Sequence, residues 1–178
     1  MIDFKEPFLA FTKSAFRLET LPEYRVEYEQ NLISDYIEGK KVDYKNEYID
    51  WWLDLVQDRN AKLMEMSRVH VVSEPLTDYL RFELGIAYPK TSAAGEKIRL
   101  ITEDDFDDIC DEDEFDVVFN RWGALDFWLF DDSRLFIMDY ADDGTWSGVN
   151  ESFDEDDIKD AMRIRDAVTL ASSPFNLA

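Results

Sequence analysis

A group of six charged or aromatic residues occurs among apolar neighbours, where folding can hold them in fixed positions. They are Arg17, Glu19, Arg68, Glu74, Arg81 and Trp128. Glu83 is a further charged residue in such a position. An arginine surrounded by aromatic residues can form a buried ion pair or line a pocket for an anion. Ion pairing is the more common role, because long charged side chains usually pack and pair. We treat these six residues as a candidate ligand pocket.

The sequence has one histidine and one cysteine, and neither predicts a nucleophilic centre. His70 lies between Val69 and Val71 on a predicted strand, where a structural role is more usual than a catalytic one. Cys110 lies within a run of acids, which raise the pKa of a thiol and disfavour the thiolate. A single cysteine also excludes an internal disulfide and a multi-cysteine zinc site. We predict no catalytic residue.

No motif for a phosphate or a metal ion is complete. Neither form of glycine-rich phosphate loop occurs in the sequence. The segment from Asp139 places Asp143 and Gly144 where a calcium-binding loop needs them. Ala141 and Asn150, however, occupy positions that require carboxylates. We therefore predict a hairpin turn there, with no metal site and no cofactor.

The chain is strongly acidic, with 41 Asp and Glu against 19 Lys and Arg and a net charge of −22. Direct binding to nucleic acid or to an anionic membrane is disfavoured, because like charges repel. The densest acidic run is 103–116. Its residues expected to form a partner-binding surface are Asp104, Asp105, Asp107, Asp108, Asp111, Glu112, Asp113, Glu114 and Asp116.

Three interpretations of this run remain open. A solvated surface is the usual role of a charge block. A surface that attracts a basic protein is the second, with mimicry of the DNA backbone as its extreme form. A hard-cation site built from carboxylates is the third. Phe106 and Ile109 are three residues apart and would lie on one face of a helix. The run therefore fits a short acidic helix or an anchored loop better than a free tail.

The elements that must position these residues follow from hydrophobic spacing and turn signals. Predicted helices cover 5–16, 26–38, 76–84 and 154–170. Predicted strands cover the end of 47–57 and 63–72, paired as a hairpin, then 97–102, 126–131, 135–138 and 146–149. Residues 16–19 are expected to be extended, 86–95 to form a polar loop, and Asp142-Asp143-Gly144 to form a hairpin turn.

Strands and helices in separate runs indicate an α+β fold, with a mainly antiparallel sheet of about five to six strands and packed helices. At 178 residues the chain has the size of one domain, which we place at 1–171, followed by a loose tail at 172–178. Since the sequence shows neither a signal peptide nor a long apolar stretch, a cytoplasmic location is expected.

Three blocks of sequence resemble a known family. The blocks are 15–19 with Tyr24, then 68–84, then Gly95-Glu96 and 126–132 with Met138, Tyr140 and Gly144. They resemble a family of uncharacterised actinobacterial proteins often encoded near Xre-type helix-turn-helix regulators. The resemblance implies a cytoplasmic partner of a DNA-binding regulator and assigns no catalytic residue. The acidic run at 103–116 is a departure from the family pattern.

Two function hypotheses follow. The first is a non-enzymatic interaction module that binds a basic protein, such as a helix-turn-helix transcription regulator, by electrostatic steering and aromatic docking. The alternative is an enzyme or small-ligand-binding domain with an arginine and carboxylate pocket, with a divalent metal as a further option. A deep pocket where those groups converge favours the alternative, and a flat acidic face favours the first.

Overall fold

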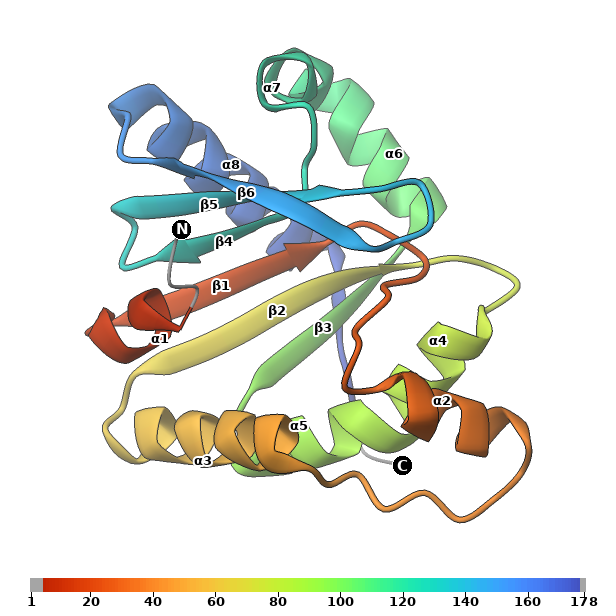
Figure 1. Cartoon of the computed structure of the whole chain (residues 1–178). Helices are drawn as coiled ribbons and strands as arrows, with labels where there is room; N and C mark the ends of the chain where they lie inside the picture. Colours follow the sequence, from red (N-terminus) through yellow and green to blue (C-terminus); the bar gives the residue numbers. More distant parts are fainter. Residues whose placement is uncertain (1–4, 177–178) are drawn as a thin grey trace.

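A seven-stranded mixed sheet runs through the computed structural model, which describes residues 5–176 (Figure 1). The strand order is β6-β5-β4-β1-β2-β3-β7. The strands are β1 (Ser14–Glu19), β2 (Glu65–Val72), β3 (Lys97–Thr102), β4 (Phe127–Phe130), β5 (Arg134–Tyr140), β6 (Trp146–Ser152) and β7 (Ser173–Pro174). β1, β2 and β3 pair in parallel, and the other pairings are antiparallel. The predicted α+β class is confirmed. The sheet has seven strands and is mixed, whereas a mainly antiparallel sheet of about five to six strands was expected.

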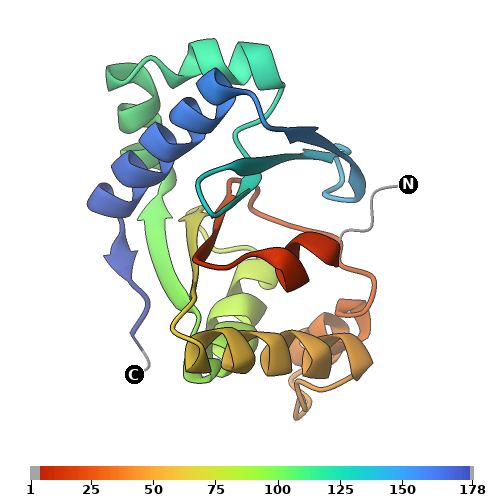
Figure 2. The ribbon, with the colours of Figure 1, turned by 90° about the vertical axis from the view of Figure 1, so that its left-hand side faces the viewer.

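Helices cover both faces of this sheet (Figure 2). They are α1 (Glu6–Ala10), α2 (Gln30–Ile37), α3 (Glu47–Ala61), α4 (Asp78–Phe82), the π-helix η1 (Glu83–Ala87), α5 (Tyr88–Ala94), α6 (Glu103–Glu112), α7 (Phe115–Trp122) and α8 (Glu155–Ala171). Successive side chains of β4 point to opposite faces of the sheet and so belong to different cores. Phe127 and Leu129 pack in the core beneath α6, α7 and α8, whereas Trp128 and Phe130 pack with α1 and α3. The strand predicted at 126–131 is confirmed, and both of its faces are covered.

Residues 47–61 form the helix α3, so the predicted hairpin of 47–57 with 63–72 is wrong. Asn46 caps the helix by accepting hydrogen bonds from the backbone N–H groups of Tyr48 and Ile49. Ile49 and Val56, seven residues apart, are buried on one face. The helix connects β1 to β2, and such a crossover is what parallel pairing of consecutive strands requires.

The segment 86–95, predicted as a polar loop, is also helical. The helix that begins at α4 does not end at Gly85 but continues through η1 into α5. Tyr88, Thr91 and Ala94 are buried, and their spacing of three places them on one helical face. The helix ends at Gly95, whose φ of 118° is in the range that favours glycine.

Both ends of the chain differ from the predictions. The helix expected over 5–16 ends at Ala10, and residues 14–19 form β1. In the tail expected to be loose, Ser173–Pro174 form β7 on β3, and Phe175 donates its backbone N–H to Ile98. Residues 1–4 and 177–178, including the end of that tail and the start of the chain, lie outside the described residues. Within 5–176, no helix combines the length and apolarity needed to cross a bilayer.

Candidate functional site

A cavity of about 610 Å³ lies on the face of the sheet that α3 covers, and we call it the aromatic cavity. Arg17, Glu19, Arg68 and Trp128, four of the six predicted pocket residues, line it. Residues from α3, η1 and α5, the segment 24–29 and the turn between β5 and β6 complete its wall. The sheet register explains the convergence. Arg17 is paired with Arg68 across β1 and β2, so both side chains project from the same face.

The remaining two predicted pocket residues lie elsewhere. Arg81 on α4 is exposed and pairs with Asp78 at 3.7 Å. Glu74 is exposed in the segment before that helix. Because Tyr79 and Leu80 occupy the buried side of α4, Arg81 is left on the solvent side. Neither Glu74 nor Arg81 contributes to the aromatic cavity.

Buried ion pairs hold two of the three arginines that line the cavity, Arg17 and Arg68. Arg17 lies 2.5 Å from Asp126 and donates a hydrogen bond to the Tyr140 hydroxyl at 3.0 Å. Arg68 contacts Glu19 at 2.9 Å and Glu96 at 2.7 Å. All the charged members of this network are almost completely buried except Arg68, which is partly buried. These two arginines are therefore held rigidly, and three carboxylates surround their two positive charges.

The electrostatics of this network follow from burial and pairing. Burial disfavours the charged form of Arg17, but Asp126, Tyr140 and Glu19 outweigh it and raise the pKa of the guanidinium. Burial would likewise raise the pKa of Glu19, yet Arg68, His70 and Arg17 lower it to about 2. For Asp126 burial prevails over Arg17 and Tyr24, and the pKa lies above its usual value. Glu19 is thus firmly ionised.

Two further carboxyl groups line the cavity, and the sequence analysis did not assign them to it. Burial raises the pKa of Glu29 to about 7, although a hydrogen bond from the Tyr44 hydroxyl at 2.8 Å opposes this. Burial and the nearby Glu29 raise the pKa of Glu83 well above its usual value. Glu83 is 5% exposed and has no hydrogen-bond or ion-pair partner within residues 5–176. It lies in η1, and π-helical turns occur frequently at functional sites.

Aromatic rings form most of the remaining cavity wall. Trp52 and Trp128 meet edge to face with their centroids 5.9 Å apart. Tyr28 and Tyr48 stack at 5.2 Å, and both are about half exposed. This exposure places the stacked pair at the mouth of the cavity. Tyr28 and Tyr48 come from different segments of the sequence, and no local motif predicts that they stack.

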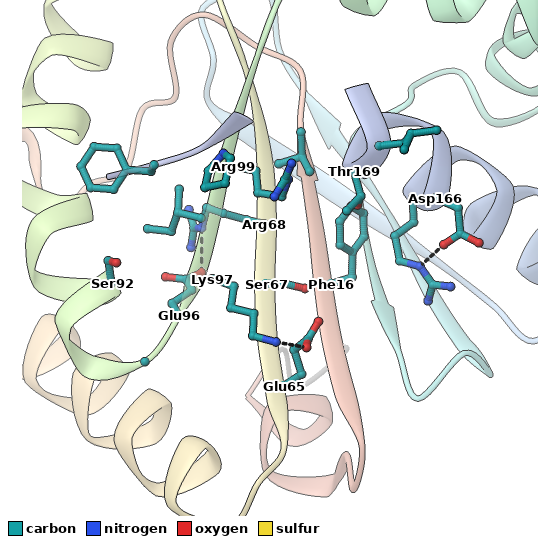
Figure 3. A pocket seen from close by; sticks show the side chains of 17 residues that line it. Phe16, Glu65, Ser67, Arg68, Ser92, Glu96, Lys97, Arg99, Asp166 and Thr169 are labelled. Atoms are coloured by element: carbon teal, nitrogen blue, oxygen red, sulfur yellow. Dashed lines mark hydrogen bonds and ion pairs between the residues drawn. The ribbon is translucent and has the colours of Figure 1, made fainter. Parts of the chain in front are cut away.

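A second cavity, of about 830 Å³, lies along β2 and β3 beside α8 and holds charges that already pair with one another (Figure 3). Lys97 pairs with Glu65, and Arg165 pairs with Asp166 at 2.9 Å. Arg99 donates to the Ser172 hydroxyl at 2.9 Å. Most of its charged groups therefore pair within the fold, although Glu96 Oε2 has no hydrogen-bond partner among the described residues, and it is the weaker candidate.

His70 and Cys110 occupy positions consistent with structural roles. The His70 ring is fully buried, with Nδ1 against the Tyr88 hydroxyl and Nε2 3.2 Å from the Leu21 carbonyl. Burial lowers the pKa of His70, which favours the neutral ring. Burial and the acids beside it raise the pKa of Cys110 to about 11, so the thiolate is disfavoured.

The acidic run is a helical surface anchored by buried rings. Phe106 in α6 and Phe115 in α7 are buried, in agreement with the expected anchored helix. The nine acids predicted to form a partner-binding surface are exposed, and within the described part of the chain none forms an ion pair. We call these nine the α6 acidic surface. No cluster of three metal-ligating side chains suited to an ion occurs in residues 5–176.

Comparison with known proteins gives a family but no activity. A family model described as a domain of unknown function (DUF6879) matches residues 2–177. A search of curated proteins found no match. The resemblance to an uncharacterised family is confirmed to this extent.

Proposed function

Because the chain belongs to the DUF6879 family, whose description names no activity, we propose from its own residues that the domain binds a small organic molecule in the aromatic cavity. One observation carries the proposal. Arg17 and Glu19 on β1 converge with Arg68 on β2, which is distant from them in sequence, on a cavity of about 610 Å³ with aromatic walls. Cavities of this size and composition, with a few fixed polar groups, are typical of ligand sites.

The buried charges support binding more than stability. Replacement of buried ion pairs by apolar residues is often neutral or stabilising, so folding alone does not require such a network. Two buried polar atoms of cavity residues, Arg17 Nη1 and Thr91 Oγ1, have no hydrogen-bond partner within residues 5–176. Buried polar groups are normally satisfied. Such unsatisfied polar atoms are available to a polar ligand or a bound water in the aromatic cavity.

A fragment screen tests this proposal. Ligand-observed NMR would measure binding to the wild-type domain and to Tyr28→Ser/Tyr48→Ser, which removes the stacked pair at the mouth. The matched control is Phe119→Ser/Phe153→Ser, which removes two exposed rings that do not line the cavity. We expect fragment binding to weaken only in the mouth variant. Equal binding in all three proteins, or none to wild type, would contradict the proposal.

A second function, binding of a basic protein such as a helix-turn-helix regulator, is supported by the α6 acidic surface. None of its acids forms an ion pair within the described residues, and Val117 and Phe119 are exposed beside them on α7. Unpaired charge increases the rate of encounter with an oppositely charged partner, and neighbouring apolar groups can then dock. DNA mimicry is the strongest form of this proposal.

Affinity capture from the native lysate at two salt concentrations tests the second function. The immobilised domain is compared with Asp107→Asn/Asp108→Asn/Asp111→Asn and with a control, Glu23→Gln/Asp43→Asn/Asp54→Asn, that removes the same number of exposed acids elsewhere. We expect a basic protein to be captured at low salt, released at about 0.5 M NaCl and lost only in the α6 variant. Capture that is equal in both variants would leave the α6 acidic surface with a solvating role alone.

A further inference from the structure

The unpartnered carboxyl group of Glu83 indicates what charge the ligand carries. This side chain lines the aromatic cavity, is 5% exposed and has no hydrogen-bond or ion-pair partner within residues 5–176. Buried carboxylates are costly unless they are paired with a cation or hydrogen-bonded. Glu29, which lines the same cavity, accepts one hydrogen bond, from Tyr44. The cavity thus contains acceptors for a positive charge that the described chain does not supply.

The three arginines that line the cavity do not change this balance, and one of them, Arg25, is exposed and paired with Asp143 at 3.2 Å. Arg17 is paired with Asp126 and Arg68 with Glu19 and Glu96, so three carboxylates surround two guanidinium groups. The sum of these buried charges is negative before Glu29 and Glu83 are considered. An anion entering the cavity would also approach a molecule of net charge −22. The electrostatic balance favours a cation.

The aromatic wall is suited to the same charge. The face of an aromatic ring attracts an ammonium group, most strongly when the ring is that of tryptophan. At the mouth of the cavity the Lys5 ammonium already lies 4.8 Å from the Trp51 ring and 5.6 Å from the Tyr48 ring. These rings therefore attract an ammonium group within the protein's own fold, and the stacked Tyr28 extends the same wall.

We propose that the aromatic cavity binds an organic cation, an amine or a quaternary ammonium compound, whose charge contacts Glu83 and Glu29 and whose body packs against the aromatic rings. This inference rests on the proposed function and specifies the ligand class for that site. Glu83 and Glu29 determine the sign of the charge. Tyr28, Tyr48 and Trp51 determine the entry of the ligand.

Isothermal titration calorimetry at neutral pH with probes of one shape and different charge tests the proposal. The probes are 2-phenylethylamine and benzyltrimethylammonium as cations, 2-phenylethanol as the neutral analogue and phenylacetate as the anion. We expect the cations to bind the wild-type domain at least about tenfold more tightly than the alcohol, and phenylacetate to bind most weakly.

Glu83→Gln isolates the charge because it keeps the size of the side chain. We expect it to weaken binding of the amine about tenfold and to leave binding of the alcohol unchanged. Glu112→Gln, the same substitution on the α6 acidic surface, is the matched control and should change neither. Tyr48→Leu at the exposed mouth gives a second test that does not disturb the core, and it should weaken the cations more than the alcohol.

Each outcome has a definite meaning. If the alcohol or phenylacetate binds as tightly as the amine and the mouth variant weakens that binding, the cavity binds small molecules but the cation proposal is overturned. If no probe binds up to about 10 mM, the cation proposal fails, while the fragment screen still decides the proposed function. If Glu83→Gln and Glu112→Gln weaken the amine equally, the effect arises from net charge and Glu83 has no specific role.

Discussion

At the scale of single residues, the buried pair Glu29 and Glu83 links stability to pH. A carboxyl group whose pKa is raised by folding keeps its proton longer in the folded state than in the unfolded state. Stability is then lost as pH rises from about 4.5 to about 7, the interval between the unfolded and folded pKa values of Glu29. The loss for Glu29 is about 3 kcal/mol at most, since each pKa unit corresponds to about 1.4 kcal/mol.

The double variant Glu29→Gln/Glu83→Gln removes this dependence. We expect it to match the wild-type free energy of unfolding at pH 4 and to exceed it by at least about 3 kcal/mol at pH 8, because the raised pKa of Glu83 adds to the contribution of Glu29. Urea denaturation across this range measures the difference. The lowered pKa values of Glu19 and His70 act equally in both proteins and cancel. A difference that does not change with pH would show that the pair titrates normally.

The ion pair of Arg17 with Asp126 should be costly to break but easy to replace. Arg17→Met leaves a buried carboxylate without its main counter-charge, and we expect a loss of about 3–5 kcal/mol in the free energy of unfolding. Arg17→Met/Asp126→Asn should recover most of that loss, because no unpaired charge remains at position 126. Urea denaturation of both variants measures the recovery. A double variant as unstable as the single one would assign the network a structural role.

At the scale of elements, the sequence predicts segments whose signal is local. The strand at 127–130 is recognisable because four apolar residues lie between acids, and α8 because Asp154 caps an acidic first turn. α3 was missed because its Trp and Ile residues also have high strand propensity. Its helical state depends on the Asn46 cap and on the crossover between β1 and β2, and the crossover becomes apparent only once strand pairing is known.

Some residues of the candidate site are likewise recognisable from the sequence, and others are not. Arg17, Glu19 and Arg68 are recognisable because alternation along a strand places charges among apolar residues. Glu83 is recognisable as a charge among apolar residues, but neither Glu83 nor Glu29 can be placed in the cavity from sequence, since one lies in a π-helix and the other precedes α2. Their raised pKa values arise from burial, which depends on how distant segments pack. Electrostatics of this kind requires the assembled fold.

Removing an acid from the first turn of α6 and removing one from its last turn should have opposite effects on stability. Acids stabilise the first turn, where the helix dipole is positive, and destabilise the last turn, where it is negative. Glu103, Asp104 and Asp105 lie in the first turn, and the last turn contains no base. We expect Asp104→Asn to lower the melting temperature, and Asp111→Asn to raise it, by about 1–2 °C each at low salt. Shifts of the same sign would mean that net charge outweighs the dipole.

At the scale of the whole molecule, the two proposed sites lie on opposite faces of the sheet. Figure 2 shows helices on both faces of the sheet. The α6 acidic surface belongs to the layer packed on Phe127 and Leu129, whereas Trp128, on the other face, lines the aromatic cavity. A partner bound to the acidic surface therefore leaves the mouth of the cavity accessible. The two functions can operate in one protein, and variants of one site serve as controls for the other.

The net charge of −22 makes the folded state resist compaction, and this repulsion should appear as an unusual response to salt. Salt weakens exposed ion pairs as well, but each contributes at most about 1 kcal/mol, and on the α6 acidic surface no ion pairs occur among the described residues. Repulsion is therefore the larger effect to be screened. We expect the melting temperature to rise by about 3–5 °C between about 0.02 M and 0.5 M NaCl.

Asp107→Asn/Asp108→Asn/Asp111→Asn should melt higher at low salt and gain less from added salt. The control Glu23→Gln/Asp43→Asn/Asp54→Asn should keep more of the salt response, because its charges are dispersed. A melting temperature that falls with salt in the wild-type domain would show that ion pairs such as Arg134 with Glu6 and Glu151 outweigh the repulsion.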